Sequence, residues 1–63
     1  MSNLTHLFKV EQKVKCNFDG IFYEGTVKET HEDYIIVDVP RVSDHCKYEN
    51  GFNMDCVYPE YNL

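Results

Sequence analysis

Three consecutive residues, Ser43, Asp44 and His45, include every side-chain type of a hydrolytic triad. A triad requires its three side chains to converge on one point. Neighbouring residues of an extended chain point to opposite sides, so these three cannot converge. The segment therefore predicts no catalytic site. The simpler interpretation is a turn in which Ser43 or Asp44 accepts hydrogen bonds from nearby backbone amides.

Cysteine and histidine side chains could also hold a metal ion. The chain contains Cys16, Cys46 and Cys56, with His31 and His45 as further candidate ligands. Structural zinc sites normally contain a close Cys-x₂₋₄-Cys pair, which this sequence lacks. An odd number of widely spaced cysteines also does not predict a disulfide framework. We therefore expect three reduced thiols that pack as small apolar groups, and neither a metal nor another cofactor.

Charge is distributed unevenly along the chain, whose formal net charge is −5. Residues 1–31 hold four bases and four acids, whereas residues 32–63 hold two bases and seven acids. Non-specific binding to nucleic acid depends on a basic surface, so we do not expect direct binding to DNA or RNA. The sequence has no apolar run of about 18 residues and no signal-peptide pattern at its start. It predicts no membrane span and a cytoplasmic location.

Alternation of apolar and polar residues predicts a strand over residues 12–18. The dipeptide Asp19-Gly20 follows, which two-residue type I′ turns prefer because both positions need positive φ. Such a turn predicts the cross-strand pairs Phe18–Ile21, Cys16–Tyr23, Val14–Gly25, Lys15–Glu24 and Glu11–Lys28. These pairs join apolar residues on one face and opposite charges on the other, which favours this register over its neighbours.

Residues 21–29 form the second predicted strand, and Gly25 near its middle predicts a bulge or bend. Residues 34–39 form the third predicted strand, which Pro40 ends. Its expected inward residues are Ile35, Val37 and Val39, and its expected outward residues are Tyr34, Ile36 and Asp38. Residues 41–44 are expected to connect this strand to the next.

A second hairpin is predicted around a three-residue loop, residues 49–51, in which Gly51 supplies a positive φ. This loop pairs Tyr48 with Phe52 and Cys46 with Met54, and places His45 opposite Asp55. The tail from residue 57 onward is expected to close a barrel edge or to form a short turn.

Five short strands, two hairpins and no helical stretch predict a single all-β domain, a small five-stranded SH3-like barrel. It covers roughly residues 10–60, and residues 1–9 are expected to fray or form a short helical turn. The element order resembles SH3-like barrels of the Tudor and KOW type, without a shared sequence motif. The resemblance implies an aromatic cage for a methylated ligand as one use of Phe18, Phe22, Tyr23, Tyr34 and Tyr58. The alternative is that these rings form the core.

We expect a non-enzymatic interaction domain that binds a protein partner through an acidic face, as a small accessory or inhibitory protein would. The expected contact residues are Phe22, Glu32, Asp33, Tyr34, Ile36, Asp38 and Asp44. Apolar groups ringed by acids would bind and steer a cationic or nucleic-acid-binding protein. Two alternatives stay open: a nucleic-acid-associated Tudor or KOW-like module, and an ordinary solvated face.

Overall fold

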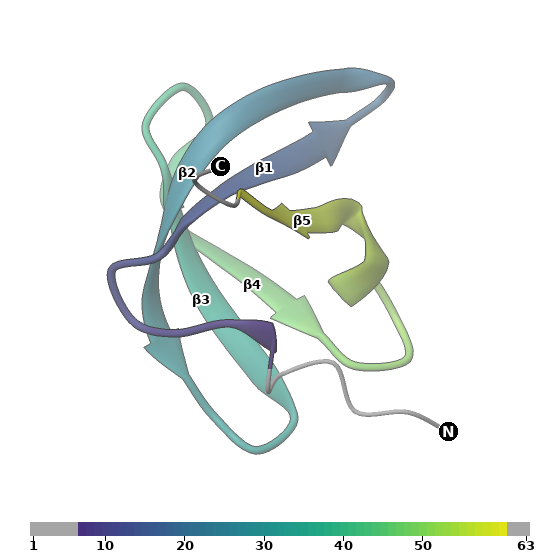
Figure 1. Cartoon of the computed structure of the whole chain (residues 1–63). Coiled ribbons are helices and arrows are strands. Elements are labelled where there is room, and N and C mark those ends of the chain that lie inside the picture. The colour runs from purple at the N-terminus through teal and green to yellow at the C-terminus, as the bar shows by residue number, and fades with distance from the viewer. Residues whose placement is uncertain (1–6, 61–63) are drawn as a thin grey trace.

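Antiparallel pairing joins five strands into one sheet in the computed structural model, which describes residues 7–60 (Figure 1). The elements are β1 (Lys13–Phe18), β2 (Ile21–Thr30), β3 (Tyr34–Val39), β4 (Ser43–Glu49), the 3₁₀ turn η2 (Met54–Cys56) and β5 (Val57–Pro59). Their order across the sheet is β4-β3-β2-β1-β5. The all-β prediction is confirmed. The edge strands β4 and β5 are not hydrogen-bonded to each other, so the sheet does not close.

The first hairpin has the predicted turn and register. Asp19 and Gly20 have φ values of 55° and 86°, and Cys16 pairs with Tyr23 as expected. The side chain of Asn17 supports the turn by accepting a hydrogen bond of 2.9 Å from the Gly20 amide. The expected pair of Glu11 with Lys28 is wrong. Glu11 lies before β1 with a φ of 74°, and its amide donates to the Val27 carbonyl at 2.7 Å.

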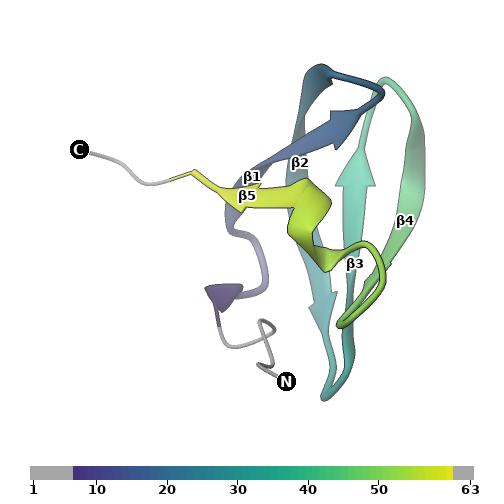
Figure 2. The same ribbon diagram turned by 90° about the vertical axis from the view of Figure 1, so that its right-hand side faces the viewer.

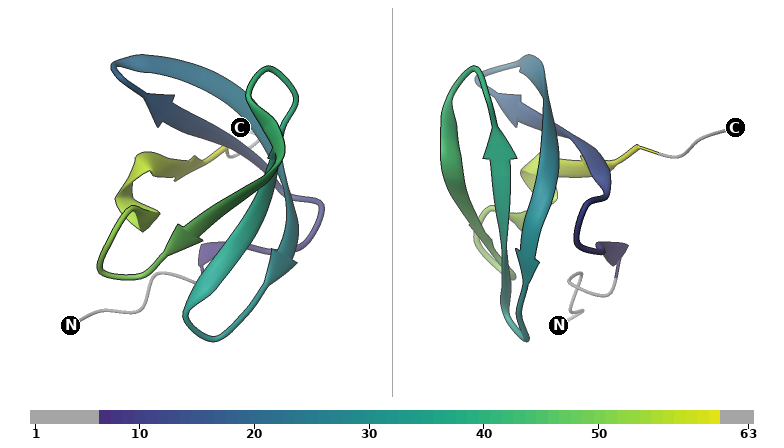
Figure 3. Two further views of the ribbon diagram at one scale, coloured as in Figure 1. Left: turned by 180° about the vertical axis from the view of Figure 1, so that it is seen from behind. Right: turned by 90° about the vertical axis from the view of Figure 1, so that its left-hand side faces the viewer.

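Strand β2 serves both halves of the sheet. Its first half pairs with β1 and its second half with β3, and Thr26 pairs with both Lys13 and Asp38. The irregularity in the ladder lies between Val27 and Glu29, not at Gly25 as the sequence suggested. Figure 3 shows the resulting curl, which places β1 and β5 on one side of the molecule and β3 and β4 on the other.

The core lies inside this curl and receives side chains from every strand. Its buried members are Phe8, Val14, Cys16, Val27, Ile35, Val37, Val39, Tyr48, Met54 and Val57. The inward set predicted for the third strand is therefore confirmed. Leu7 has 3₁₀ geometry and Phe8 is buried at 5% exposure, so these two residues agree with the predicted short helical turn and not with fraying. The rest of that prediction, for residues 1–6, lies outside the described residues.

The predicted second hairpin is wrong. Strand β4 pairs only with β3, and the chain then turns into η2 and β5, which pairs with β1 through Cys16 and Val57. Figure 2 shows η2 and β5 crossing from the β4 side of the molecule to β1. The side chain of Asn53 holds the turn by accepting from the Glu49 amide at 2.7 Å and donating to the Lys47 carbonyl at 3.1 Å. Of the tail prediction, residues 57–59 form an edge strand beside β1 that does not close a barrel, and residues 61–63 lie outside the described residues.

The position of Met54 explains why a hairpin does not form. Its side chain is 2% exposed and packs in the same cluster as Val57. Continued pairing with β4 would leave β1 without an outer neighbour. Residues 7–60 contain no helix with the length and hydropathy that crossing a membrane requires.

Candidate functional site

The residues of the predicted acidic face do not form one surface. Glu32 and Asp33 lie in the turn between β2 and β3, and the backbone carbonyl of Asp33 accepts a hydrogen bond of 2.9 Å from the Asn50 amide just beyond β4. Asp44 lies near the start of β4, where Ser43 pairs with the last residue of β3. A six-residue strand spans about 17 Å between its first and last Cα atoms. These carboxylates therefore stand at opposite ends of the β3–β4 ladder.

Asp38 and Asp44 share the second of these ends. Asp38 is half-buried on β3, whereas Asp44 is exposed. Burial raises the pKa of the Cys46 thiol, and the negative charges of both carboxylates raise it further. Of the four carboxylates predicted to share one face, only Asp38 and Asp44 thus lie together at this end of the sheet.

Tyr34 makes several contacts within the molecule. Its ring stacks on His31 with centroids 4.3 Å apart and planes 15° apart. The Nζ atom of Lys47 lies 4.6 Å from the ring centroid, in cation–π contact. His31 in turn places its Nε2 atom 2.7 Å from the Glu29 carboxylate. A partner would have to compete with these contacts for the ring.

Ile36 is buried, with an exposed fraction of only 4%. Its expected role as an exposed contact residue is therefore wrong. It does not belong to the core cluster, and its register neighbours are Glu29 on β2 and Lys47 on β4. Long side chains on adjacent strands cover apolar surface with their methylene groups. The alternation of residues along β3 correctly placed Ile36 on the face away from the core. It could not show that side chains of the neighbouring strands cover Ile36 on that face.

Phe22 does not lie beside Tyr34. It faces Asn17 in the β1–β2 hairpin, far from the end of β2 that pairs with the start of β3. Its neighbour is Tyr58 on β5, with ring centroids 5.6 Å apart and planes 58° apart. The two rings are 56% and 46% exposed. Phe22 therefore belongs to a surface that the sequence did not predict.

Charged side chains border these two rings. Lys15 pairs with Tyr58 in the β1–β5 ladder, and its Nζ atom lies 3.3 Å from Glu24 and 3.9 Å from Glu60. We call Phe22, Tyr58, Lys15, Glu24 and Glu60 the aromatic patch. The Lys15–Glu24 pair was predictable from the first hairpin. Tyr58 was not, because only the pairing of β5 with β1 brings it to this face.

The five candidate cage rings separate into three groups. Phe18 and Tyr23 form an edge-to-face pair with centroids 5.7 Å apart. Phe22 contacts Tyr58, and Tyr34 stacks on His31. A cage needs several rings around one point, so the five do not form one together.

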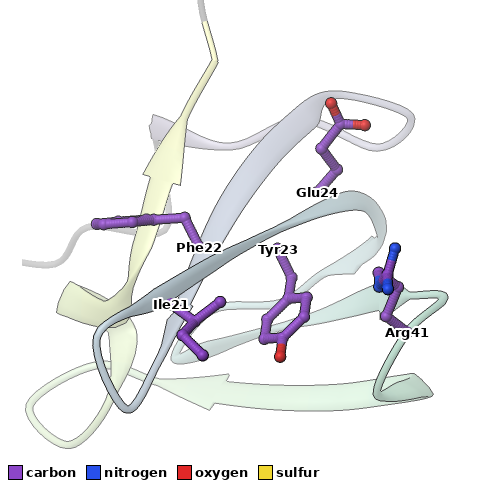
Figure 4. Close-up of a pocket in the computed structure, with 5 residues that line it drawn as sticks. All are labelled: Ile21, Phe22, Tyr23, Glu24 and Arg41. Atoms are coloured by element: carbon purple, nitrogen blue, oxygen red, sulfur yellow. The ribbon is translucent and has the colours of Figure 1, made fainter.

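An open pocket of about 480 Å³ lies between the first half of β2 and the turn that joins β3 to β4. It is lined by Ile21, Phe22, Tyr23, Glu24 and Arg41. Figure 4 shows Ile21 and Tyr23 projecting from one side of β2, with Phe22 on the other side and Arg41 on the turn. The pocket thus combines an apolar wall with a guanidinium and a phenol hydroxyl.

The three cysteines are free thiols, and Cys16 is fully buried. Burial raises the pKa of the Cys16 thiol, and the buried hydroxyl of Tyr48 has no hydrogen-bond partner in the described part of the chain. In the described part of the chain, no three metal-ligating side chains are placed to hold an ion. The Oγ atom of Ser43 accepts the predicted hydrogen bond, 3.2 Å from the His45 amide, but residues 43–45 belong to strand β4, so the predicted turn and the predicted connector over residues 41–44 are wrong there.

No protein-family model, curated protein or solved structure matches this chain.

Proposed function

We propose that this chain is a non-enzymatic interaction domain that binds a protein partner, with the aromatic patch at the centre of the contact surface. The observation that carries the proposal is the exposed pair of Phe22 and Tyr58, whose rings contact each other on the outer face of β2 and β5. Large aromatic side chains bury much area at little cost in conformational entropy, and they recur as binding hot spots.

The surroundings of the two rings support a protein partner. Lys15, Glu24 and Glu60 form a polar rim, which is typical of protein interfaces. The ion pairs among them restrict these side chains before a partner arrives, so less entropy is lost on binding.

The charge of the whole chain favours a cationic partner, including a nucleic-acid-binding protein. The formal net charge is −5, and charge complementarity accelerates association. In this proposal Glu32, Asp33, Asp38 and Asp44 steer the partner from a distance and do not form one contact surface. A cytoplasmic accessory or inhibitory role is compatible with this arrangement.

The fold resembles a small SH3-like barrel, and we propose that membership. Support comes from the meander of β1 to β4, the return of β5 to β1, and one core that receives Val14, Val37 and Val57 from different parts of the curl. The alternative function, a nucleic-acid-associated Tudor or KOW-like module, would need free basic groups. Lys15 is ion-paired with acids, and Lys13 donates to Thr26 at 3.2 Å.

The test is affinity capture from an extract of the source cells, followed by calorimetry with the purified partner. We expect Phe22→Ser and Tyr58→Ser each to weaken binding at least about tenfold, as loss of a hot-spot aromatic does. Phe52→Ser is the matched control, because Phe52 is 79% exposed in the turn after β4, away from the patch.

Equal losses in all three variants, or none in Phe22→Ser and Tyr58→Ser, would contradict the proposed contact surface. Circular dichroism of each variant would confirm that the fold is retained. A Glu32→Lys/Asp33→Lys variant shows whether the turn acids act at a distance, since it should slow association while leaving dissociation nearly unchanged.

A further inference from the structure

Arg41 is the only arginine of this acidic chain. Within residues 7–60 it forms neither an ion pair nor a hydrogen bond. It lies in the tight turn between β3 and β4, which a 2.8 Å hydrogen bond from the Val42 amide to the Val39 carbonyl closes. A guanidinium presents five donors in a fixed fork that matches a carboxylate. This fork borders the open pocket between the turn and β2.

The opposite wall of the pocket comes from Ile21 and Tyr23 on β2 (Figure 4). The Tyr23 ring is half-buried and held by its edge-to-face contact with Phe18. Among the described residues its hydroxyl has no hydrogen-bond partner. Ile21 lies beside it and is 57% exposed. The wall therefore offers one polar donor next to apolar surface.

Glu24 also lines the pocket, and its carboxylate shares the Lys15 ammonium with that of Glu60. Its carboxylate lies 3.3 Å from the Nζ atom of Lys15, on the β1 side of β2. Two lining groups, the Arg41 guanidinium and the Tyr23 hydroxyl, can donate to an anion and have no partner among residues 7–60. A single cation next to a carboxylate suits a monoanion better than a phosphate, which carries more charge and needs more donors.

We propose that this pocket binds the C-terminal carboxylate of a peptide whose last residue is apolar. A terminal residue carries its carboxylate directly beside its own side chain, which matches a pocket that has the Arg41 guanidinium and the exposed side chain of Ile21 in its lining. A glutamate or aspartate side chain brings no adjacent apolar group. The inference does not rest on the proposed function, because its donors, Arg41 and Tyr23, lie outside the aromatic patch, although Phe22 and Glu24 border both surfaces.

Titration of the full ¹⁵N-labelled chain by NMR tests the proposal with acetyl-Gly-Gly-Leu. We expect the peptide to shift the amides of residues 21–24 and of Arg41 and Val42 first. The C-terminal amide of the same peptide should bind at least about tenfold more weakly, since it loses a charge-assisted hydrogen bond. Acetyl-Gly-Gly-Glu-amide and inorganic phosphate, which lack the adjacent apolar side chain or the single charge, should both bind more weakly than the free acid.

Variants then assign the contacts. Arg41→Gln should weaken binding of the free acid about tenfold, and Arg41→Lys should give an intermediate loss because it keeps the charge without the fork. Tyr23→Phe, which keeps the ring, should cost a few-fold. Lys28→Gln is the matched control, because it removes one exposed positive charge from the distant half of β2.

Equal binding of the acid and its amide would overturn the proposal, as would an unchanged affinity in Arg41→Gln. The same holds if phosphate or the glutamate peptide binds more tightly than the free acid, or if the shifts centre on the lysines of β1.

Discussion

Gly25 is a residue whose role the sequence suggested only in part. Its place inside a strand predicted a bulge or bend, yet the ladder is regular at this position and the irregularity lies further along β2. The structure shows a different reason for glycine: the residue is buried, and an added Cβ would lie 2.9 Å from Val37 Cγ1 and 3.1 Å from the Asp38 carbonyl. Close approach of β3 requires this residue, and alternation along one strand cannot reveal it.

Gly25→Ala should therefore lower the free energy of unfolding by about 1–3 kcal/mol, through overpacking against Val37. Urea denaturation measures this. Gly20→Ala measures the effect of backbone strain without overpacking, because nothing lies within 4 Å of its added Cβ while its φ is +86°. That variant should lose about 1 kcal/mol. If overpacking is the cause, Val37→Ala should cost less in the Gly25→Ala background than alone, and additive losses would contradict it.

Cys16 and Tyr48 make stability depend on alkaline pH. Burial is the main cause that raises the pKa of both groups in the folded chain. Thiols of the unfolded chain ionise near pH 8.5. Above that pH the unfolded chain releases protons that the native state retains, so unfolding becomes more favourable. The free energy of unfolding should stay nearly constant below about pH 8 and fall as the pH rises toward 11.

Urea denaturation at a series of pH values measures this decline. Cys16→Ala should make it shallower, because the variant removes one of the shifted groups. Tyr48→Phe should do the same above pH 10, where an unfolded tyrosine ionises. A slope that neither substitution changes would assign the decline to charge repulsion among the acids instead.

At the scale of elements, prediction succeeded where the signal was local. The Asp19-Gly20 turn, the β1–β2 register and the buried set of β3 all follow from residues close together in the sequence. The second hairpin failed because its evidence, the Asn50-Gly51 turn and possible pairs across it, did not include the competing partner. Strand β5 pairs with β1, about forty residues earlier in the chain, and only the packing of Met54 and Val57 favours that choice.

Replacement of Val57 tests the importance of this last strand. Val57 is 4% exposed and lies opposite Cys16, so Val57→Ala should lower the free energy of unfolding by about 2 kcal/mol through the cavity it leaves. Val42→Ala is the matched control, because Val42 is 48% exposed in the β3–β4 turn and should lose less than about 0.5 kcal/mol. Equal losses would mean that β5 adds little to the core.

At the scale of the whole molecule, total charge was a better guide than the position of each acid. Counting residues predicted an acidic second half, but the topology places Glu32 and Asp44 at opposite ends of the β3–β4 ladder. It also brings Glu60 to Lys15 on the first strand. A candidate site assembled from one stretch of sequence does not show which charged residues lie together, because the sheet order mixes residues from both halves of the chain.

The same distribution of charge predicts that the unmodified chain does not bind nucleic acid at physiological salt. Affinity for DNA comes largely from cations that replace condensed counterions, and Lys15 lies against two carboxylates. Fluorescence anisotropy with labelled single-stranded and double-stranded 20-mers in about 150 mM salt measures this.

Glu24→Gln/Glu60→Gln removes both acids and changes the formal net charge from −5 to −3. At low salt this variant should show weak binding that disappears as salt rises, since the lysines of β1 are then free. Tight binding by the unmodified chain, falling steeply with salt, would instead favour the nucleic-acid-associated module.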